Sequence, residues 1–484
     1  MTIKDLKPSV VWNNFYGLTR VPRPSKKEGK AVEYLYGFGK SLGLETIKDE
    51  TGNIIIRKPA TPGMENRKGV ILQGHMDMVP QKNPDVEHDF EKDPIETWID
   101  GEWVKAKGTT LGADNGIGVA MALSVLQSDD IKHGPVEVLV TIDEETGMTG
   151  ARALKPGVLK GDILINLDSE TEGELYIGCA GGMDATARIP YRTESVPEGY
   201  VPCVVEVSGC QGGHSGMDII LYRANANKVL ARVLLPLLRD HGARLVSLEG
   251  GNMRNAIPRE ARAVILIPAG WRAEAGEYAA RTEAVVKSEY AVTDPQLSIS
   301  VSDAGPQTSC INAEDGLKCI RLLLISPEGV DRMSDQMPGL VETSNNTAIA
   351  RTGDGEFVIK TLMRSSVDSA KDLLAGKMRA AVELAGGSVE FTGGYSGWAP
   401  NSASPILHVM KDVYEKMYGT APAVLAIHAG LECGIISGSY PDLDMVSCGP
   451  TIMSPHSPDE RLNIPSVEKC WNYLKAVLES IPEK

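Results

Sequence analysis

The first 170 residues alternate apolar strand-like runs with helical patterns, and this alternation restricts the fold more than any other feature of the chain. Strands that alternate with helices predict a mostly parallel sheet covered by helices, in a three-layer α/β arrangement. The expected strands are 69–74, 136–142 and 162–167, and the expected helices are 117–126 and a segment that begins near Gly147.

The chain before the first apolar run predicts two helices and a hairpin. The helices are expected at 5–20 and 25–43, and the run 44–57 alternates and turns at Asp49–Asn53, which is typical of a hairpin. The second helix opens with Ser25-Lys-Lys-Glu28, a sequence that predicts a capping box.

Side chains that can bind metals follow each of the three apolar strands. The carboxyl ends of parallel strands meet at one edge of an α/β sheet, which is where such sheets bind ligands. We therefore expect these side chains to gather at one place. They are His75 and Asp77 after the first strand, Asp143, Glu144 and Glu145 after the second, and Asp168 after the third.

Between the first two strands lies a loop of small residues, Gly108-Thr-Thr-Leu-Gly-Ala-Asp114-Asn-Gly116. Because glycine and alanine leave room around the backbone, the chain can come close to whatever Asp114 binds. We interpret Asp114 as the carboxylate that bridges two metal ions.

The pattern of strand-like and helical segments changes near residue 185, and the first pattern returns near residue 395. Strand-like runs and helices between these positions predict an inserted α/β sandwich, and their rhythm favours internal doubling without demonstrating it. The predicted domains are a catalytic domain in two parts, 1–184 and 395–484, and a lid domain, 185–394. Two tandem domains followed by a third are the alternative.

Composition excludes several classes of partner. The chain has 484 residues, 42% of them hydrophobic, and a formal charge of −15, which argues against nucleic acid and anionic membranes as partners. No apolar run approaches the ~20 residues of a membrane span, and the N-terminus lacks the apolar core of a signal peptide. The eight cysteines form no CxxC pair, so we expect reduced thiols and a cytoplasmic protein.

Imidazole and carboxylate side chains of the kind that zinc prefers occur at five positions. A pair of zinc ions would need a bridging anion and would acidify a shared water, and a carboxylate that binds no metal could carry its proton. Spacing does not decide which of Glu144 and Glu145 binds metal and which faces the substrate. Singly, each motif is common at protein surfaces. The candidate ligands are His75, Asp114, Glu145, Asp168 and His456.

Four motifs together resemble the dinuclear zinc exopeptidases that include carboxypeptidase G, aminoacylase and the carnosinases. These motifs are Gly-His75-Met-Asp-Met-Val-Pro, Gly-Ala-Asp114-Asn-Gly, Asp143-Glu-Glu-Thr-Gly and Asn166-Leu-Asp-Ser. They stand in family order along the whole chain. Within the family, the resemblance favours the branch of dipeptidases that hydrolyses Xaa-His substrates.

The resemblance implies a role for each candidate. His75 and Asp168 would serve one zinc, Glu145 and His456 the other, and Asp114 would bridge them. Glu144 would be the general base and acid, and Asp77 would orient His75, as a carboxylate commonly orients a ligating histidine. A cis peptide between Asp114 and Asn115 is also implied.

The insert resembles the family lid. Its His214, in a glycine-rich segment, would stabilise the tetrahedral oxyanion, whereas Asn255 and Arg364 would hold the substrate's C-terminal carboxylate. His428 and Glu432 are placed in a substrate-facing loop without fixed roles.

The predicted function is therefore a cytoplasmic zinc dipeptidase that takes two zinc ions and acts on Xaa-His and related dipeptides. The alternatives are an N-acyl amino acid deacylase of the same fold and a non-catalytic metal-dependent binding protein. Manganese or cobalt could replace zinc. The sequence does not decide the preferred dipeptide, nor whether the protein is a homodimer in which His214 acts across chains.

Overall fold

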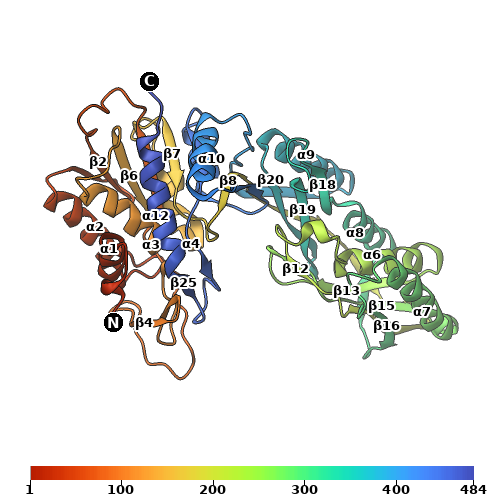
Figure 1. The fold of residues 1–484 in the computed structure, drawn as a ribbon. Helices are drawn as coiled ribbons and strands as arrows, with labels where there is room; N and C mark the ends of the chain where they lie inside the picture. The colour runs from red at the N-terminus through yellow and green to blue at the C-terminus, as the bar shows by residue number, and fades with distance from the viewer. Residues whose placement is uncertain (1) are drawn as a thin grey trace. The chain divides into compact units, whose positions relative to one another are not determined.

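A computed structural model describes residues 2–484 of the chain, and the residues form two compact units (Figure 1). Of the described residues, unit 1 comprises 2–178, 398–426 and 431–484, and unit 2 comprises 179–397 and 427–430. The four residues 427–430, which we predicted to belong with the C-terminal part of the catalytic domain, group instead with unit 2. His428 is one of them.

Unit 1 is built on an eight-stranded sheet in the order β1-β2-β6-β3-β7-β23-β8-β22. Its centre is parallel, because β3 pairs in parallel with both β6 and β7, and β7 with β23. The expected hairpin is present at its edge as β1 and β2. The strands are β1 Glu45–Lys48, β2 Ile54–Lys58, β3 Val70–His75, β6 Val136–Thr141, β7 Ile163–Asn166, β8 Glu174–Cys179, β22 Ala423–Ile427 and β23 Asp444–Ser447.

Helices cover this sheet and confirm the predicted α/β class. Every residue of α3 from Ala113 to Leu126 is buried, because α3 packs on β3 and is itself covered by α1. Helix α10 packs on β23 and on α12. The helices are α1 Ser9–Thr19, α2 Gly29–Ser41, α3 Ala113–Gln127, α4 Glu144–Gly147, α5 Thr149–Ala153, α10 Pro405–Tyr418, α11 Glu432–Ser439 and α12 Ile464–Glu479.

A small antiparallel sheet in unit 1 brings distant segments together. Its order is β24-β25-β5-β4, with β4 Thr97–Asp100, β5 Trp103–Ala106, β24 Ile452–Met453 and β25 Arg461–Asn463. The loop of His456 connects β24 to β25, and the loop of Asp114 follows β5. Pairing of β25 with β5 therefore holds the two loops near each other.

The predicted capping box at Ser25–Glu28 is wrong. Helix α2 begins at Gly29, and no side chain of residues 2–484 caps its N-terminus. Ser25 Oγ instead donates to Asp77 Oδ2 at 2.8 Å, and Glu28 Oε1 accepts from the backbone N–H of Lys26 and of Asp143. Ser25 and Glu28 therefore make contacts with residues distant in sequence, which a local sequence rule cannot predict.

Unit 2 is built on a nine-stranded antiparallel sheet in the order β16-β11-β15-β13-β19-β20-β9-β21, with β18 beside β19. A group of four strands meets a group of five, which includes β18, at β13 and β19. Among the described residues these two strands share only the pairs Glu249↔Arg351 and Gly250↔Ala350. We did not predict β9, β18 or β21. The strands are β9 Gly181–Pro190, β11 Tyr200–Ser208, β13 Arg244–Gly250, β15 Ala261–Pro268, β16 Ser298–Asp303, β18 Gly329–Met333, β19 Val341–Gly353, β20 Glu356–Ser365 and β21 Ser388–Tyr395.

Four helices pack on this sheet and enclose the core of unit 2. Helix α6 packs on β11, β15 and β13, α7 on β16, and α9 on β20, β9 and β21, while α8 contacts α6 and α9. The helices are α6 Ala226–Asp240, α7 Arg272–Glu289, α8 Ala313–Ile325 and α9 Asp368–Leu384. Short strand pairs complete the unit, β10 Thr193–Ser195 with β17 Ser309–Ile311 and β12 Gly213–His214 with β14 Ala256–Ile257.

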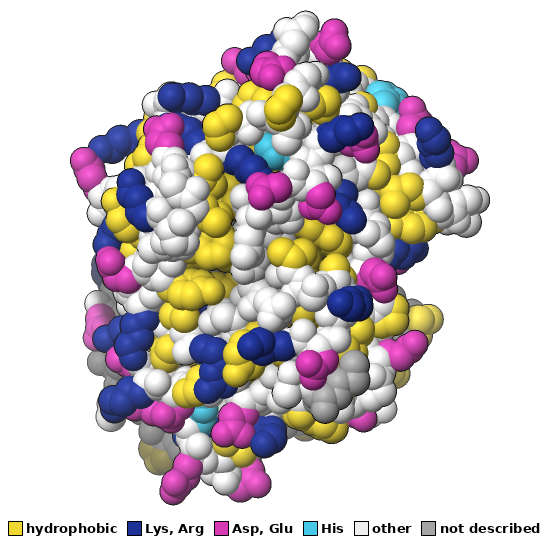
Figure 2. Space-filling view, turned by 60° about the vertical axis from the view of Figure 1, so that its left-hand side comes forward, with side chains coloured by type: hydrophobic (Ala, Val, Ile, Leu, Met, Phe, Trp, Pro, Cys, Tyr) yellow, Lys and Arg dark blue, Asp and Glu magenta, His cyan; other side chains and the backbone are white. Residues whose placement is uncertain are grey.

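Acidic and basic side chains are interspersed over the face drawn in Figure 2, with hydrophobic side chains between them. The negative net charge is therefore not gathered into one patch on that face. None of the eight cysteines, all of which the structure describes, forms a disulfide bond. Among residues 2–484, no helix combines the length and the apolar character that crossing a membrane requires.

Candidate metal and catalytic site

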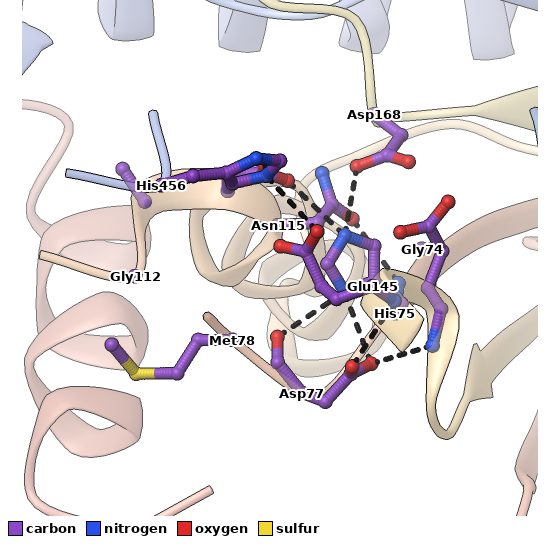
Figure 3. Close-up of polar contacts among 12 residues, drawn as sticks. Gly74, His75, Asp77, Met78, Gly112, Asn115, Glu145, Asp168 and His456 are labelled. Atoms are coloured by element: carbon purple, nitrogen blue, oxygen red, sulfur yellow. Dashed lines mark hydrogen bonds and ion pairs between the residues drawn. The ribbon is translucent and has the colours of Figure 1, made fainter. Parts of the chain in front are cut away.

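The carboxylate of Asp114 lies between two histidines at the carboxyl edge of the unit 1 sheet. Figure 3 shows these histidines, His75 and His456, with the neighbouring carboxylates of Glu145 and Asp168. Asp114 Oδ1 is 3.1 Å from Nε2 of His75, and Oδ2 is 3.0 Å from Nε2 of His456. His75 ends strand β3, and His456 comes from the loop between β24 and β25. One carboxylate thus presents a separate oxygen to each of two neighbouring groups.

Each histidine nitrogen also faces a second carboxylate. His75 Nε2 is 3.3 Å from Asp168 Oδ1, and His456 Nε2 is 2.9 Å from Glu145 Oε2. The result is two sets of one nitrogen and two oxygens that share Asp114. A single ring N–H cannot satisfy two carboxylates, whereas a cation at each set could contact all three atoms. Ligand atoms of His75, Asp114 and Glu145 lie within 4.8 Å of one another.

The backbone around Asp114 departs from helical geometry although α3 formally includes it. The Asp114–Asn115 peptide is cis, as the resemblance implied, and Gly112 has a φ of +67°. The Asn115 side chain donates to the carbonyl of Leu167 at 2.6 Å and accepts from the N–H of His75 at 3.3 Å. Asn115 therefore ties the loop to β3 and to the segment after β7.

Asp77 supports three residues of the site from beneath. Its Oδ1 is 3.3 Å from Nδ1 of His75 and accepts the N–H of Glu144 at 3.0 Å. Its Oδ2 accepts the N–H of Glu145 at 3.3 Å and the hydroxyl of Ser25. Asp77 is fully buried, so it fixes the imidazole and the start of α4 together.

The two glutamates after β6 stand in different surroundings. Glu145 faces His456 and has its other oxygen, Oε1, buried without a hydrogen bond among the described residues. Burial, reinforced by the charges of Asp168, Glu432 and Glu145, holds the pKa of Glu144 well above its usual value. A carboxyl group with a raised pKa suits proton transfer.

Negative charge accumulates in the site beyond what its histidines balance. Burial raises the pKa of Asp168 to about 6 although His75 opposes it. Burial followed by the charges of Asp114 and Asp168 raises the pKa of Glu170, which we did not predict, to about 8. Hydrogen bonds to Asp114 and Glu145 raise the pKa of His456 to about 11. Such an excess of carboxylates is the electrostatic setting of a cation site.

Two predicted lid residues, His214 and Arg364, lie together with His428 within unit 2. A Cβ atom added to Gly216 would lie 2.2 Å from the carbonyl oxygen of His428, 3.1 Å from His214 Cε1 and 3.2 Å from Arg364 Nε, so these groups converge there. His428 Nε2 is 2.7 Å from the hydroxyl of Ser344, which is the register partner of Arg364. Arg364 is 6% exposed, and its Nε makes no hydrogen bond among the described residues.

The other two predicted substrate residues, Asn255 and Glu432, differ in their exposure: one is exposed and one is fully buried. Asn255 is exposed, and its carbonyl accepts the N–H of Ser215 at 2.9 Å. Glu432 is fully buried in unit 1, where Gln73 and Thr141 donate to its Oε2 at 2.6 and 2.7 Å. Glu432, predicted in a substrate-facing loop, therefore begins helix α11 and belongs to the polar interior of unit 1.

Two further residues at the site were not found by sequence reasoning. Glu460 contacts the backbone of the Asp114 loop, and Arg23 donates to carbonyls of the same loop and of the segment after β3. Glu460 lies four residues after His456, in the same loop as that predicted metal ligand. Arg23 carried no such signal.

The model of the peptidase family M20/M25/M40 matches residues 71–480. The chain belongs to this family. It is 45% identical to the cytosol non-specific dipeptidase of Escherichia coli strain K12 over 482 residues, which is 100% of this chain and 99% of that protein.

Two solved structures are similar to this M20/M25/M40 member over nearly its whole length. The crystal structure of aminoacylhistidine dipeptidase from Vibrio alginolyticus is 46% identical, with a TM-score of 0.96 and coverage of 100% of this chain and 99% of that chain. The aminopeptidase PepT from Bacillus cereus has a TM-score of 0.58 at 17% identity, with 98% and 99% of the chains covered, and shares the fold alone. The fold class and the resemblance are thus confirmed.

Proposed function

We propose that this protein is a metal-dependent dipeptidase that hydrolyses short peptides with a free C-terminus, Xaa-His dipeptides among them. The observation that carries the proposal is the division of the two Asp114 oxygens between His75 and His456, each with a further carboxylate. The full-length similarity to two dipeptidases supports the same reaction class.

The residues fit a pair of divalent cations. His75 and Asp168 would hold one ion, Glu145 and His456 the other, and Asp114 would bridge them. The unsatisfied buried Oε1 of Glu145 supports this fit, because a buried oxygen without a donor is costly unless a cation faces it. The ions would polarise the peptide carbonyl and acidify a water molecule. Zinc suits the mixture of imidazole and carboxylate, and manganese or cobalt could replace it.

Glu144 would carry the proton of the reaction. Its carboxyl group has a raised pKa, and its backbone N–H is anchored on Asp77. It would take a proton from the attacking water and return it to the leaving amine, as general acid–base catalysis requires. Asp77 would keep the His75 ring in one orientation.

The residues of unit 2 would recognise the substrate. The buried guanidinium of Arg364 forms no ion pair with a carboxylate of residues 2–484, so it would grip the C-terminal carboxylate of the substrate. His214 Nδ1 accepts the N–H groups of Gly216 and Met217 at 3.2 and 3.1 Å, so the neutral ring carries its proton on Nε2. This Nε2–H would donate to the oxyanion. Asn255 and His428 would line the same region.

The names of the two relatives differ on selectivity, one being non-specific and the other an aminoacylhistidine dipeptidase. We infer a broad dipeptidase that includes Xaa-His in its range. A cytoplasmic location follows the name of the Escherichia coli relative, and a homodimer stays a prediction.

A substrate panel tests the proposal directly. The metal-loaded protein should hydrolyse Xaa-His and other dipeptides, should leave N-acetyl amino acids intact, and should lose activity after chelation. Preferential release of acetate would favour the deacylase alternative. Zinc binding without hydrolysis of any panel member would favour a binding protein.

A further inference from the structure

One buried carboxylate ties the loop of Asp114 to the loop of His456. Glu460 is 2% exposed and lies four residues after His456, between β24 and β25. Its two oxygens accept four consecutive backbone N–H groups. The donors are Leu111 at 2.7 Å and Gly112 at 3.0 Å to Oε2, and Ala113 at 2.7 Å and Asp114 at 3.2 Å to Oε1.

Arg23 holds the same loop through its carbonyl side. The guanidinium is 2% exposed, and one nitrogen donates to the carbonyl of Gly112 at 2.6 Å. Its other terminal nitrogen donates to the carbonyls of Met76 and Asp77 at 3.0 and 3.2 Å. An anion and a cation therefore fix the peptide groups that precede Asp114 in one orientation.

We propose that Glu460 is a positioning residue that sets the bridging carboxylate of Asp114 against His456. The inference rests on the proposed function, because it concerns how two of the proposed metal ligands are held. Asp114 and His456 are far apart in sequence, so the 3.0 Å between Oδ2 and Nε2 depends on contacts between their loops. Glu460 belongs to one loop and binds the backbone of the other.

The arrangement requires an anion with two acceptor oxygens. A glutamine of the same shape would keep one acceptor oxygen and turn an NH₂ group toward two backbone N–H donors. Those donors are buried, and leaving them unpaired would displace the loop. Glu460 therefore acts through its charge and both oxygens, and not only by filling space.

Loss of Glu460 should weaken the binding of the two proposed ions unequally. His75 ends a central strand and Asp168 follows another, so the sheet holds these two ligands. His456 lies on the loop that Glu460 anchors. The ion served by His456 and Glu145 should therefore weaken more than the ion served by His75 and Asp168.

Metal titration of Glu460→Gln tests the proposal. The full-length chain is stripped of metal and titrated with Zn²⁺ alone against a competing chelator, beside Glu460→Asp and the control Glu137→Gln. Glu137 is also buried and accepts a backbone N–H, that of Lys160 at 2.6 Å, but it lies at the opposite end of strand β6. Glu460→Gln should weaken one Zn²⁺ site 10- to 100-fold and the other by less than 10-fold. Raised Zn²⁺ should restore kcat.

Several outcomes would overturn the proposal. They are unchanged affinity at both sites in Glu460→Gln, an equal loss at both, or the same loss in Glu137→Gln. If Glu460→Gln does not fold, Glu460→Asp carries the test, since it keeps two acceptors at a shorter reach and should show the same unequal weakening. A wild-type chain that binds no Zn²⁺ would instead overturn the proposed function, so the two failures are distinguishable.

Discussion

Single carboxylates in this site each serve more than one partner, and this sharing determines what a substitution does. Asp114 divides its oxygens between two histidines, and Asp77 holds His75 and the backbone of both Glu144 and Glu145. Replacing a residue that contacts several groups should therefore disturb all of those groups. Replacing a residue with a single role should remove that role and leave the rest of the site in place.

Asp114→Ala should abolish binding of both metal ions, because each proposed ligand set includes one Asp114 oxygen. His456→Ala is the matched variant, since it removes a ligand from one set only and should leave one ion bound. Elemental analysis after dialysis gives the stoichiometry. One ion retained tightly by Asp114→Ala would place the bridge elsewhere.

Glu144→Gln should keep both ions and lower kcat by about 10²–10⁴-fold, the usual contribution of a general acid–base group. The amide keeps the shape of the side chain but cannot accept the proton. Metal content and thermal unfolding should match the wild-type protein. Hydrolysis at the wild-type rate would remove Glu144 from the mechanism.

His428 should make the protein sensitive to acid. Burial, followed by the charge of Arg364, lowers the pKa of His428 to about 3, against about 6.5 for an unfolded histidine. The unfolded chain therefore binds more protons between these values, and the free energy of unfolding should fall as pH drops through this window, by up to about 1.4 kcal/mol per pH unit. Urea unfolding at several pH values measures this slope.

His428→Asn should flatten that slope between about pH 6 and pH 4. His408→Asn, at an exposed position of α10, is the control and should leave the slope unchanged. If His428→Asn retains the wild-type pH dependence, other groups cause the acid sensitivity.

At the scale of elements, the short connection before α3 is the segment that positions Asp114. Gly112 has a φ of +67°, and an added Cβ would lie 2.6 Å from an Arg23 nitrogen and 2.8 Å from the Met78 sulfur. The residue must therefore be glycine both for its backbone conformation and for the space around it. Strand β5 precedes this connection, and β25 follows the loop of His456. Pairing of the two strands therefore fixes where the connection begins and where His456 lies.

Gly112→Ala should lower the free energy of unfolding by about 2–4 kcal/mol, combining left-handed strain with overpacking. Gly101→Ala is the matched control, since Gly101 has a φ of +59° with nothing within 4 Å of an added Cβ. It should cost only about 1–2 kcal/mol of strain. Equal losses in chemical denaturation would show that the packing around Gly112 is not tight.

At the scale of the whole molecule, the two units carry different parts of the chemistry. All five proposed metal ligands belong to unit 1, whereas His214, Arg364 and His428 belong to unit 2. Anything that binds the folded state alone stabilises it, so the proposed ions should stabilise unit 1 more than unit 2.

Removal of metal should therefore increase amide hydrogen exchange in unit 1, most of all in residues 108–116, and change unit 2 little. Exchange measured by mass spectrometry with and without a chelator checks this. An equal rise in both units would contradict a site built from unit 1 alone. Re-addition of Zn²⁺ should restore the original protection.

Local pattern predicted the central strands β3, β6 and β7 of unit 1 and most of the proposed ligands. Apolar strands such as Val70–His75 are buried on both faces, so their sequence signal is continuous, and the parallel sheet brings the residues after each strand to one edge. His75, Glu145 and Asp168 could thus be grouped from the sequence. The resemblance strengthened the assignment of His456 and added the cis peptide, which no periodicity indicates.

Only the tertiary structure decided the contacts between segments distant in sequence. Ser25 and Glu28 looked like a capping box but bind Asp77 and the Asp143 backbone, and Glu432 looked like a loop residue but is buried. Arg23 and Glu460 grip one loop from positions at opposite ends of the sequence. Hydrogen bonds of this kind depend on where the folded chain brings each group, and no local sequence pattern records that.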